Sequence, residues 1–362
     1  MSQRVRIKDI ALHAGVSKGT VDRVIHGRGN VSAEAKRRVL AAMEELHYEP
    51  NQMASILAYN KTWTIATLMP NFEQDHFWAQ PHQGMEQAAT MVRDYGVKVI
   101  HYFFDGEQPN DFSRAAQQIL QTECDAVLVA PIFLQEAHAF FDACEAKSIW
   151  YGQVNTYIER NSPYALFYVG QDSYQSGVLA AKLLNFGLAE QETAMILHLE
   201  KSVINAAHLL EKEKGFEDYF SQHQTNDIHT NKASFTEVQD ERQFQKFIEY
   251  TLSNHTSLRG IFVTTSRLFH LARQLERMNV RHLKLVGFDL IAENLHYLQA
   301  EQIDFLINQN PQRQGYTGIL NLMNHLVFKK QSKAIQHLPL DVVMRENVAH
   351  YLEDVVDLQM KL

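Results

Sequence analysis

The fold of the N-terminal region is decided by residues 6–58, which read RIKDIALHAGVSKGTVDRVIHGRGNVSAEAKRRVLAAMEELHYEPNQMASILA. Apolar side chains recur at helical spacing and predict a first helix over residues 7–14. Gly15 suits a left-handed turn and Ser17 suits a helix N-cap, so a second helix is expected over residues 18–26. Two short helices joined by a tight glycine turn predict a helix-turn-helix.

A third helix is expected to follow, beginning at the N-cap Ser32 and ending at about Leu46. Its periodicity predicts four inward side chains, Val39, Leu40, Met43 and Leu46. Three helices of this size form a small domain whose core is made of these residues and the apolar faces of the first two helices.

The charge is unevenly divided along the chain. Residues 1–61 contain ten Lys and Arg against six Asp and Glu, whereas the remaining residues contain 24 basic and 36 acidic groups. A basic head on an acidic body predicts that the head, and not the body, contacts a polyanion such as nucleic acid.

Length and composition exclude several classes of protein. The chain has 362 residues, which is too long for one ordinary domain. Its residues are 45% hydrophobic and 21% charged, and this composition excludes a mainly disordered or fibrous protein. No apolar run is long enough for a membrane span, and the charged N-terminus lacks the apolar core of a secretory signal. With only two cysteines, no disulfide framework is expected, and the predicted location is the cytoplasm.

Six motifs in order resemble the lactose-repressor (LacI/GalR) family of bacterial transcription regulators: IKDIA, AGVS, TV-x-RV, NVS, RVL-x-AMEEL, and Y-x-PN followed by A-x-x-L. The resemblance covers residues 5–60. It implies a helix-turn-helix DNA-binding domain over residues 1–50, a hinge helix and linker over 51–61, and a two-lobed effector-binding and dimerisation domain over 62–362.

The resemblance also implies which residues contact DNA. Lys18, Gly19 and Arg23 occupy positions that reach base edges, and Arg23 suits two hydrogen bonds to a guanine. Phosphate contacts are implied for Ser17, Thr20, Asn30 and Ser32, and a leucine wedged into the minor groove for Leu57. The full expected set is Arg6, Ser17, Lys18, Gly19, Thr20, Asp22, Arg23, Asn30, Ser32, Asn51, Ala54 and Leu57.

Two of these positions depart from the family pattern. Gly19 has no side chain where the family generally places a base-reading residue. Asp22 stands where serine is usual; its carboxylate would accept a hydrogen bond from a cytosine amine, orient Arg23, or pair with Arg23 or Lys18. Both departures bear on the operator sequence and not on DNA binding itself.

Beyond Trp63, short apolar runs alternate with amphipathic stretches, which predicts parallel, doubly wound sheets. This region resembles the two-lobed periplasmic sugar-binding fold. The resemblance implies one lobe of about 62–167 plus 291–320, another of about 168–290 plus the C-terminal segment, and crossovers near 167–170 and 288–290. The expected strands are residues 64–70, 97–103, 125–131, 148–154, 166–172, 194–200, 259–265, 283–289 and 304–310. Helices are expected between most of these strands, for example over residues 81–95, 111–122, 174–186 and 312–327.

Ligands of such sheets bind at the carboxyl ends of strands, so the residues there are the candidate effector contacts. Trp78 suits stacking on a sugar ring or a base. By resemblance, Asp289 holds a ligand hydroxyl, and Lys212 stands where the family more often has an arginine, which removes the bidentate fork. The candidates are Asn71, Phe72, Phe77, Trp78, Asn155, Asp172, Lys212, Asp289 and Gln309.

Signatures of catalysis are missing from the sequence. It contains no phosphate-binding loop, dinucleotide fingerprint, metalloprotease motif, C-x-x-C or nucleophile elbow, and its 18 histidines suggest no metal site. We therefore expect no cofactor and a DNA-binding regulator instead of an enzyme. Its expected partners are a pseudo-palindromic duplex operator, a sugar-like effector and a second copy of the chain, with no membrane. The alternatives are a cytoplasmic sugar-acting enzyme with an accessory helical head and a solute-binding transport component.

Overall fold

A computed structural model of the chain describes residues 5–25, 29, 31–46, 48, 61–200, 205–222 and 228–352. The chain forms two compact units, Met1–Lys61 and Thr62–Leu362. In the part that the structure describes, no helix is both long and apolar enough to cross a membrane.

The first unit contains the predicted helix-turn-helix. Its helices are α1 (Ile7–Ala14), α2 (Lys18–Ile25) and α3 (Ala33–Glu45). Gly15 ends α1 in the left-handed region at φ 62°, and Ser32 caps α3 by accepting a hydrogen bond from the Ala35 N–H at 3.3 Å. The core includes the fully buried Ile10, Val21 and Val39.

Leu40 corrects one expectation about this core. It was expected to face inward, but it is 49% exposed, and Ala42 is the second buried residue of α3. Consecutive helical residues point about 100° apart, so Leu40 cannot share the direction of Val39.

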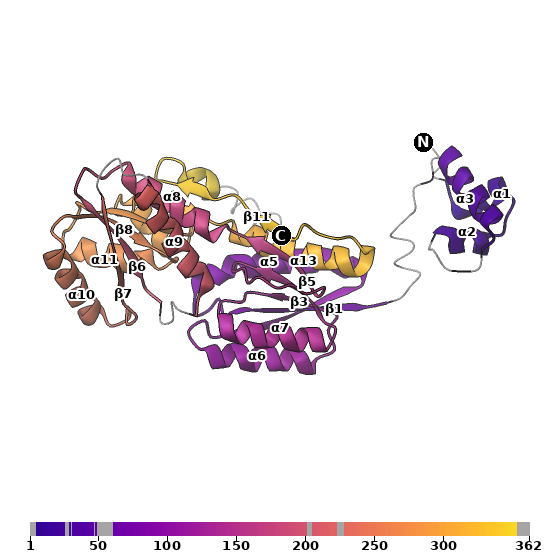
Figure 1. The fold of residues 1–362 in the computed structure, drawn as a ribbon, viewed down its shortest axis with the longest axis horizontal. Helices are drawn as coiled ribbons and strands as arrows, with labels where there is room; N and C mark the ends of the chain where they lie inside the picture. Colours follow the sequence, from indigo (N-terminus) through magenta and orange to yellow (C-terminus); the bar gives the residue numbers. More distant parts are fainter. Residues whose placement is uncertain are drawn as a thin grey trace. The chain divides into compact units, whose positions relative to one another are not determined.

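The second unit consists of two lobes, each built on a six-stranded sheet. The sheet of the first lobe has the order β11-β5-β4-β3-β1-β2, and all of its strand pairs are parallel. Its strands are β1 (Trp63–Pro70), β2 (Val97–Phe104), β3 (Ala126–Val129), β4 (Trp150–Val154), β5 (Ala165–Gly170) and β11 (Ile335–His337). Helices α5 and α13 cover one face of this sheet, and α6 and α7 cover the other (Figure 1). These elements are α5 (Ala79–Val92), preceded by η1 (His76–Trp78) and followed by η2 (Arg93–Tyr95), then α6 (Pro109–Gln121), α7 (Leu134–Ala146) and α13 (Pro311–Phe328).

The sheet of the second lobe has the order β12-β10-β9-β8-β6-β7, and only β12 is antiparallel to its neighbour. Its strands are β6 (Thr193–His198), β7 (His229–Ser234), β8 (Leu258–Val263), β9 (Lys284–Phe288), β10 (Phe305–Asn308) and β12 (Asp341–Val343). Its helices are α8 (Ser173–Asn185), α9 (Ala207–Gln222), α10 (Glu241–Asn254), α11 (Leu268–Arg277) and α12 (Ala292–Gln299). One core lies under α8 and α9, and another under α10, α11 and α12.

All nine expected strands of this unit are present, because buried parallel strands read as continuous apolar runs. The four helices given as examples are present too, as α5, α6, α8 and α13. Three strands were not expected. Strand β7 is a polar, half-exposed edge strand, and β11 and β12 are three residues long, so none of them has a strong apolar pattern.

The expected lobe boundaries need two corrections. The C-terminal segment was assigned to the second lobe, but Ile335 of β11 pairs with Tyr168 of β5 in the first sheet. Residues 291–320 were assigned as a whole to the first lobe, but Phe305 of β10 pairs with Val286 of β9 in the second sheet. The chain therefore crosses between the lobes after β10 and not near residues 288–290. The order of strands along the chain does not specify which sheet a strand joins, and only the pairing settles it.

Candidate functional site

A cavity of about 440 Å³ lies between the two lobes of the second unit, within the usual range for small-molecule sites. It is formed where the carboxyl ends of strands from both sheets meet, as expected for doubly wound sheets. The first lobe contributes Asn71, Gln74, Asp75, Phe77, Trp78, Asp105, Gly106, Glu107, Ile132, Phe133, Asn155 and Gln171; the rest of the lining is Glu200, Ala206, His208, Leu209, Lys212, Gln239, Thr265, Ser266, Arg267, Asp289 and Gln309.

Most of the sequence-based effector candidates are brought together in this lining: Asn71, Phe77, Trp78, Asn155, Lys212, Asp289 and Gln309. The lining does not include Phe72 or Asp172. The Phe72 ring stacks on His82, with centroids 4.6 Å apart, and the Asp172 carboxylate accepts the Gln175 N–H at 2.9 Å as the N-cap of α8. Both residues were nominated because they lie next to a strand end in the sequence. That position does not determine where a side chain points.

The aromatic part of the wall is built by the short helix η1. The Asp75 carboxylate accepts the Phe77 N–H at 3.1 Å and so begins the turn. The rings of Phe77 and Trp78 are 4.9 Å apart at 80°, an edge-to-face pair, and both residues are almost fully buried. Burial raises the pKa of Asp75, and Arg267 opposes this rise.

On the opposite lobe, Asp289 and Gln309 form a fixed polar pair. Gln309 Nε2 donates to both carboxylate oxygens of Asp289, at 3.0 and 2.9 Å, and the Asn294 amide donates to the Asp289 carbonyl at 3.2 Å. Asp289 adopts a left-handed φ of 71°, which is uncommon for a residue other than glycine. Burial raises the pKa of Asp289, and the Gln309 hydrogen bonds and the charge of Lys212 act against that rise.

Lys212, on α9, is the lysine of the cavity lining. This helix packs closely on α8, because Cβ atoms at Gly177 and Gly215 would each lie 2.0 Å from a backbone oxygen of the other helix. Lys212 Nζ donates to the Thr264 carbonyl at 3.0 Å and sits 3.5 Å from the ring centroid of Phe288. Burial lowers the pKa of Lys212, while the charge of Asp289 favours its protonated form.

A second charged cluster surrounds Arg267, which joins the two lobes. Its guanidinium lies 3.1 Å from the carboxylate of Glu107 in the first lobe and 3.3 Å from that of Glu200 in the second. Burial opposes the charge on Arg267, but Glu200, Asp75 and Glu107 outweigh burial and raise its pKa. Burial raises the pKa of Glu200 to about 7 in spite of Arg267.

Sequence reasoning missed several residues of this lining: Asp75, Glu107, Gln171, Glu200, His208 and Arg267. Gln171 and Glu200 lie at the carboxyl ends of the expected strands 166–172 and 194–200, so the same strand-end rule could have nominated them. Arg267 and Glu107 are 160 residues apart, and nothing local in the sequence indicates that they pair.

Several of the residues expected to contact DNA lie on or beside α2. Lys18, Gly19 and Arg23 are exposed on α2, and Arg23 Nε donates to the Gly19 carbonyl at 3.1 Å. Ser17 caps α2: its hydroxyl accepts the Thr20 N–H at 3.1 Å and lies 3.0 Å from the Thr20 hydroxyl. Of the other expected DNA contacts, Arg6 and Ser32 are exposed helix caps and Asp22 is half-buried, whereas Asn30, Asn51, Ala54 and Leu57 lie outside the described residues.

The fold and the cavity define a class of protein: a ligand-binding domain of two doubly wound lobes preceded by a helix-turn-helix. Residues 65–330 match the family described as periplasmic binding protein domain, and residues 6–51 match the family described as bacterial regulatory proteins, lacI family. The chain belongs to the lacI family of bacterial regulatory proteins.

Individual relatives agree with this assignment. The chain is 30% identical over 216 residues to the HTH-type transcriptional regulator AscG of Escherichia coli, which covers 59% of this chain and 60% of AscG. It is 26% identical over 295 residues to the ribose operon repressor of Halalkalibacterium halodurans, covering 78% of this chain and 80% of that protein. A solved structure from Bacteroides fragilis, described as a LacI transcriptional regulator, superposes with a TM-score of 0.71 at 26% identity, covering 80% of this chain and all of that chain.

Proposed function

We propose that this chain is a transcriptional regulator that binds a pseudo-palindromic DNA operator as a homodimer. A small carbohydrate that carries no phosphate or carboxylate group, bound between the lobes, controls its affinity for that operator. The observation that carries the effector part is the composition of the cavity: an aromatic wall on one lobe and unsatisfied, buried amide groups on both. The name of one relative, a ribose operon repressor, also supports a sugar.

Two buried amides of the lining have hydrogen-bonding capacity to offer a ligand. Gln171 Nε2 and Gln309 Oε1 have no hydrogen-bond partner among the described residues, although both atoms are buried. Buried polar atoms in folded proteins are nearly always paired, so a donor and an acceptor without partners in a cavity favour a ligand with several hydroxyl groups. The apolar face of a sugar ring matches the wall formed by Phe77 and Trp78.

The charges of the lining favour a ligand without phosphate. Five carboxylates line the cavity, Asp75, Asp105, Glu107, Glu200 and Asp289, against the two cations Lys212 and Arg267. Arg267 is engaged by Glu107 and Glu200. Burial lowers the pKa of His208 to about 3, so this histidine adds no positive charge at neutral pH. We therefore expect neutral sugars or amino sugars to bind better than sugar phosphates or organic acids.

A panel of ligands tests the effector. Calorimetry on the full chain should give saturable binding to at least one neutral sugar or amino sugar and none to the matching sugar phosphate. A ligand at 100 times its Kd adds about 2.7 kcal/mol to the stability of the folded state, so a thermal shift should accompany each hit. Binding of phosphorylated sugars alone would contradict the proposed effector class.

Operator binding is tested through its coupling to the effector. DNA fragments selected from a random pool should bind with an affinity that falls steeply with salt, as for a protein that neutralises several phosphates. Arg23→Ala should weaken binding and relax base preference at one position. The bound sugar must change DNA affinity by the same factor as DNA changes sugar affinity, so independent binding would rule out the mechanism.

The fate of the bound ligand distinguishes the proposed regulator from the alternative, a sugar-acting enzyme. If nuclear magnetic resonance shows the bound sugar recovered unchanged after prolonged incubation, the regulator is supported. Conversion of the sugar would support the enzyme.

A further inference from the structure

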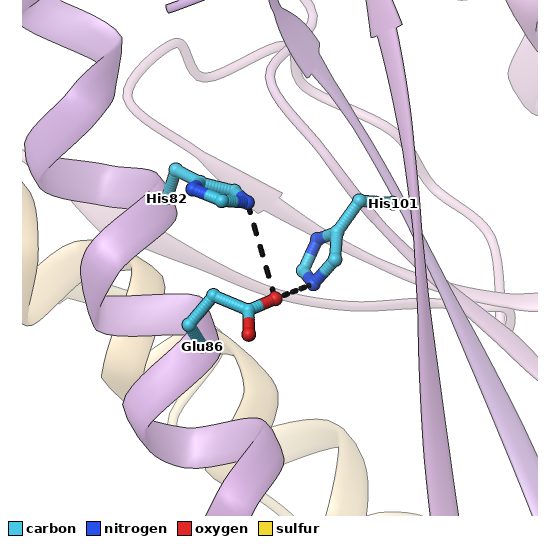
Figure 2. A group of neighbouring side chains, drawn as sticks. All are labelled: His82, Glu86 and His101. Carbon is cyan, nitrogen blue, oxygen red and sulfur yellow. Dashed lines mark ion pairs between the residues drawn. The ribbon is translucent and has the colours of Figure 1, made fainter.

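Three metal-ligating side chains meet at the edge of the first lobe, away from the effector cavity. His82 and Glu86 lie one turn apart on α5, and His101 lies on β2, the edge strand (Figure 2). Glu86 Oε1 is 2.5 Å from His101 Nε2 and 3.9 Å from His82 Nε2. One ligand atom from each residue can be chosen so that all three lie within 4.8 Å of one another.

Surrounding groups hold both imidazoles in place. The His82 ring stacks on Phe72 with an interplanar angle of 19° and contacts Phe103 edge-on. His101 Nδ1 lies 2.8 Å from the hydroxyl of Thr67, which is fully buried. The threonine hydroxyl can accept a hydrogen bond from Nδ1–H, which leaves the lone pair of Nε2 for a ligand. Such an outer hydrogen bond is the usual support of a metal-ligating histidine.

The contact between His101 and Glu86 does not by itself account for this arrangement. The two atoms are at ion-pair distance, yet Nε2 of His101 does not make a directed hydrogen bond. A second imidazole, that of His82, approaches the same carboxylate oxygen. Two histidines and one carboxylate around a single point form a ligand set that zinc commonly uses.

The site is accessible from solvent. The side chains of His101 and His82 are 14% and 22% exposed, whereas that of Glu86 is 53% exposed and free to adjust. A groove of about 370 Å³, lined in part by Glu86 and His101, opens beside them and offers a path of entry for an ion.

We propose that His82, Glu86 and His101 bind a divalent transition-metal ion of the zinc type, through Nε2 of each histidine and one oxygen of Glu86. Water completes the coordination. Imidazole ligands favour zinc and its neighbours over magnesium or calcium, which prefer oxygen throughout. Zinc–ligand bonds of about 2.0–2.2 Å place tetrahedral ligand atoms roughly 3.3 Å apart, so the His101–Glu86 contact widens and the His82–Glu86 contact closes. The ion thereby links α5 to the edge strand.

Cobalt is the probe for the test, because tetrahedral Co²⁺ absorbs visible light and is displaced by Zn²⁺. The full chain, without a histidine tag and freed of metal, should take up about one equivalent of Co²⁺ with visible absorption, and Zn²⁺ should abolish the signal. Zn²⁺ should also raise the Tm, because an ion that binds only the folded state stabilises it.

Three variants locate the site. Glu86→Gln changes a half-exposed surface residue, and His82→Asn keeps a polar side chain; each should weaken Co²⁺ binding more than tenfold. The control His282→Asn removes an exposed histidine before β9 and should leave the affinity unchanged. Circular dichroism verifies folding of each variant. Failure of the parent to bind Co²⁺, or equal affinity in the parent, Glu86→Gln and His82→Asn, would overturn the proposal.

Discussion

The two lobes place different chemistry on the same backbone frame. Asn155 and Asp289 are equivalent residues: each follows the fourth strand of its sheet, in the orders β2-β1-β3-β4 and β7-β6-β8-β9. Both adopt a left-handed conformation, with φ of 65° and 71°. Yet the first lobe presents a neutral amide at this point, and the second presents a carboxylate held by Gln309 and facing the charge of Lys212.

A second pair of equivalent residues also differs in chemistry between the two lobes. Gln171 and Gln309 follow β5 and β10, the fifth strands of the two sheets, and both line the cavity. Gln309 uses its amide to hold Asp289, whereas Gln171 Nε2 has no partner among the described residues. The second lobe therefore carries a preorganised polar anchor, and the first carries the aromatic wall and adaptable amides. A shared turn fixes where a side chain projects, and the side chain decides what that lobe recognises.

The largest effect is expected from Asp289→Ala. Removing the carboxylate leaves the Gln309 amide without its partner and takes away the negative charge that favours protonated Lys212. We expect a loss of about 3 kcal/mol in affinity for the sugar identified in the panel. Calorimetry measures this loss. The matched variant Asn155→Ala should lose about 1 kcal/mol, the cost of a neutral hydrogen bond. Equal losses in the two variants would contradict the division of roles between the lobes.

The second lobe should also carry the pH dependence of stability. The pKa of Glu200 is raised from 4.5 to about 7 in the folded protein, so its stabilising contribution is complete below pH 4.5 and is lost as pH rises through 7. Glu200→Gln mimics the protonated form and should gain about 2 kcal/mol over the parent at pH 8, allowing for partial exposure of the side chain.

Thermal unfolding of the two proteins at pH 5 and pH 8 measures that difference. The gap in stability should be small at pH 5 and open by pH 8. A gap that is constant across this range would show that Glu200 does not titrate in this way.

The aromatic wall of the first lobe should contribute less than the anchor. Trp78→Ala should lower sugar affinity about tenfold, or about 1.4 kcal/mol, because stacking on a sugar face is lost while the polar contacts remain. Trp78→Phe keeps an aromatic face and should recover part of the loss in calorimetry. An unchanged affinity in Trp78→Ala would show that the aromatic wall does not contact the bound sugar.

The smallest effect on the ligand is expected at Asp172, which the sequence nominated but the cavity lining does not include. Asp172 is the N-cap of α8, so Asp172→Ala should lower the free energy of unfolding by about 1 kcal/mol and leave sugar affinity unchanged. Denaturant unfolding and calorimetry on the same preparation separate the two quantities. A loss of affinity comparable to that of Asp289→Ala would return Asp172 to the site.

Much of this molecule follows from local pattern. The helix-turn-helix could be predicted nearly residue by residue, because its features depend on residues only three or four positions apart. These features are the turn at Gly15, the N-cap at Ser32 and the buried faces of α1 to α3. Buried strands are recognisable in the sequence as apolar runs. The rule that ligands bind at the carboxyl ends of strands then nominated Asn155, Asp289 and Gln309, which all line the cavity.

Other features depend on residues that are distant in the chain. The pairing of β10 with β9 decides where the chain crosses between lobes, and Arg267 reaches Glu107 across 160 residues. His82 and Glu86 share a helix face at a spacing of four, but their third partner, His101, comes from the adjacent strand. Local spacing is encoded by helix and strand geometry within a few residues, whereas these contacts depend on how whole elements pack, which no short stretch of sequence specifies.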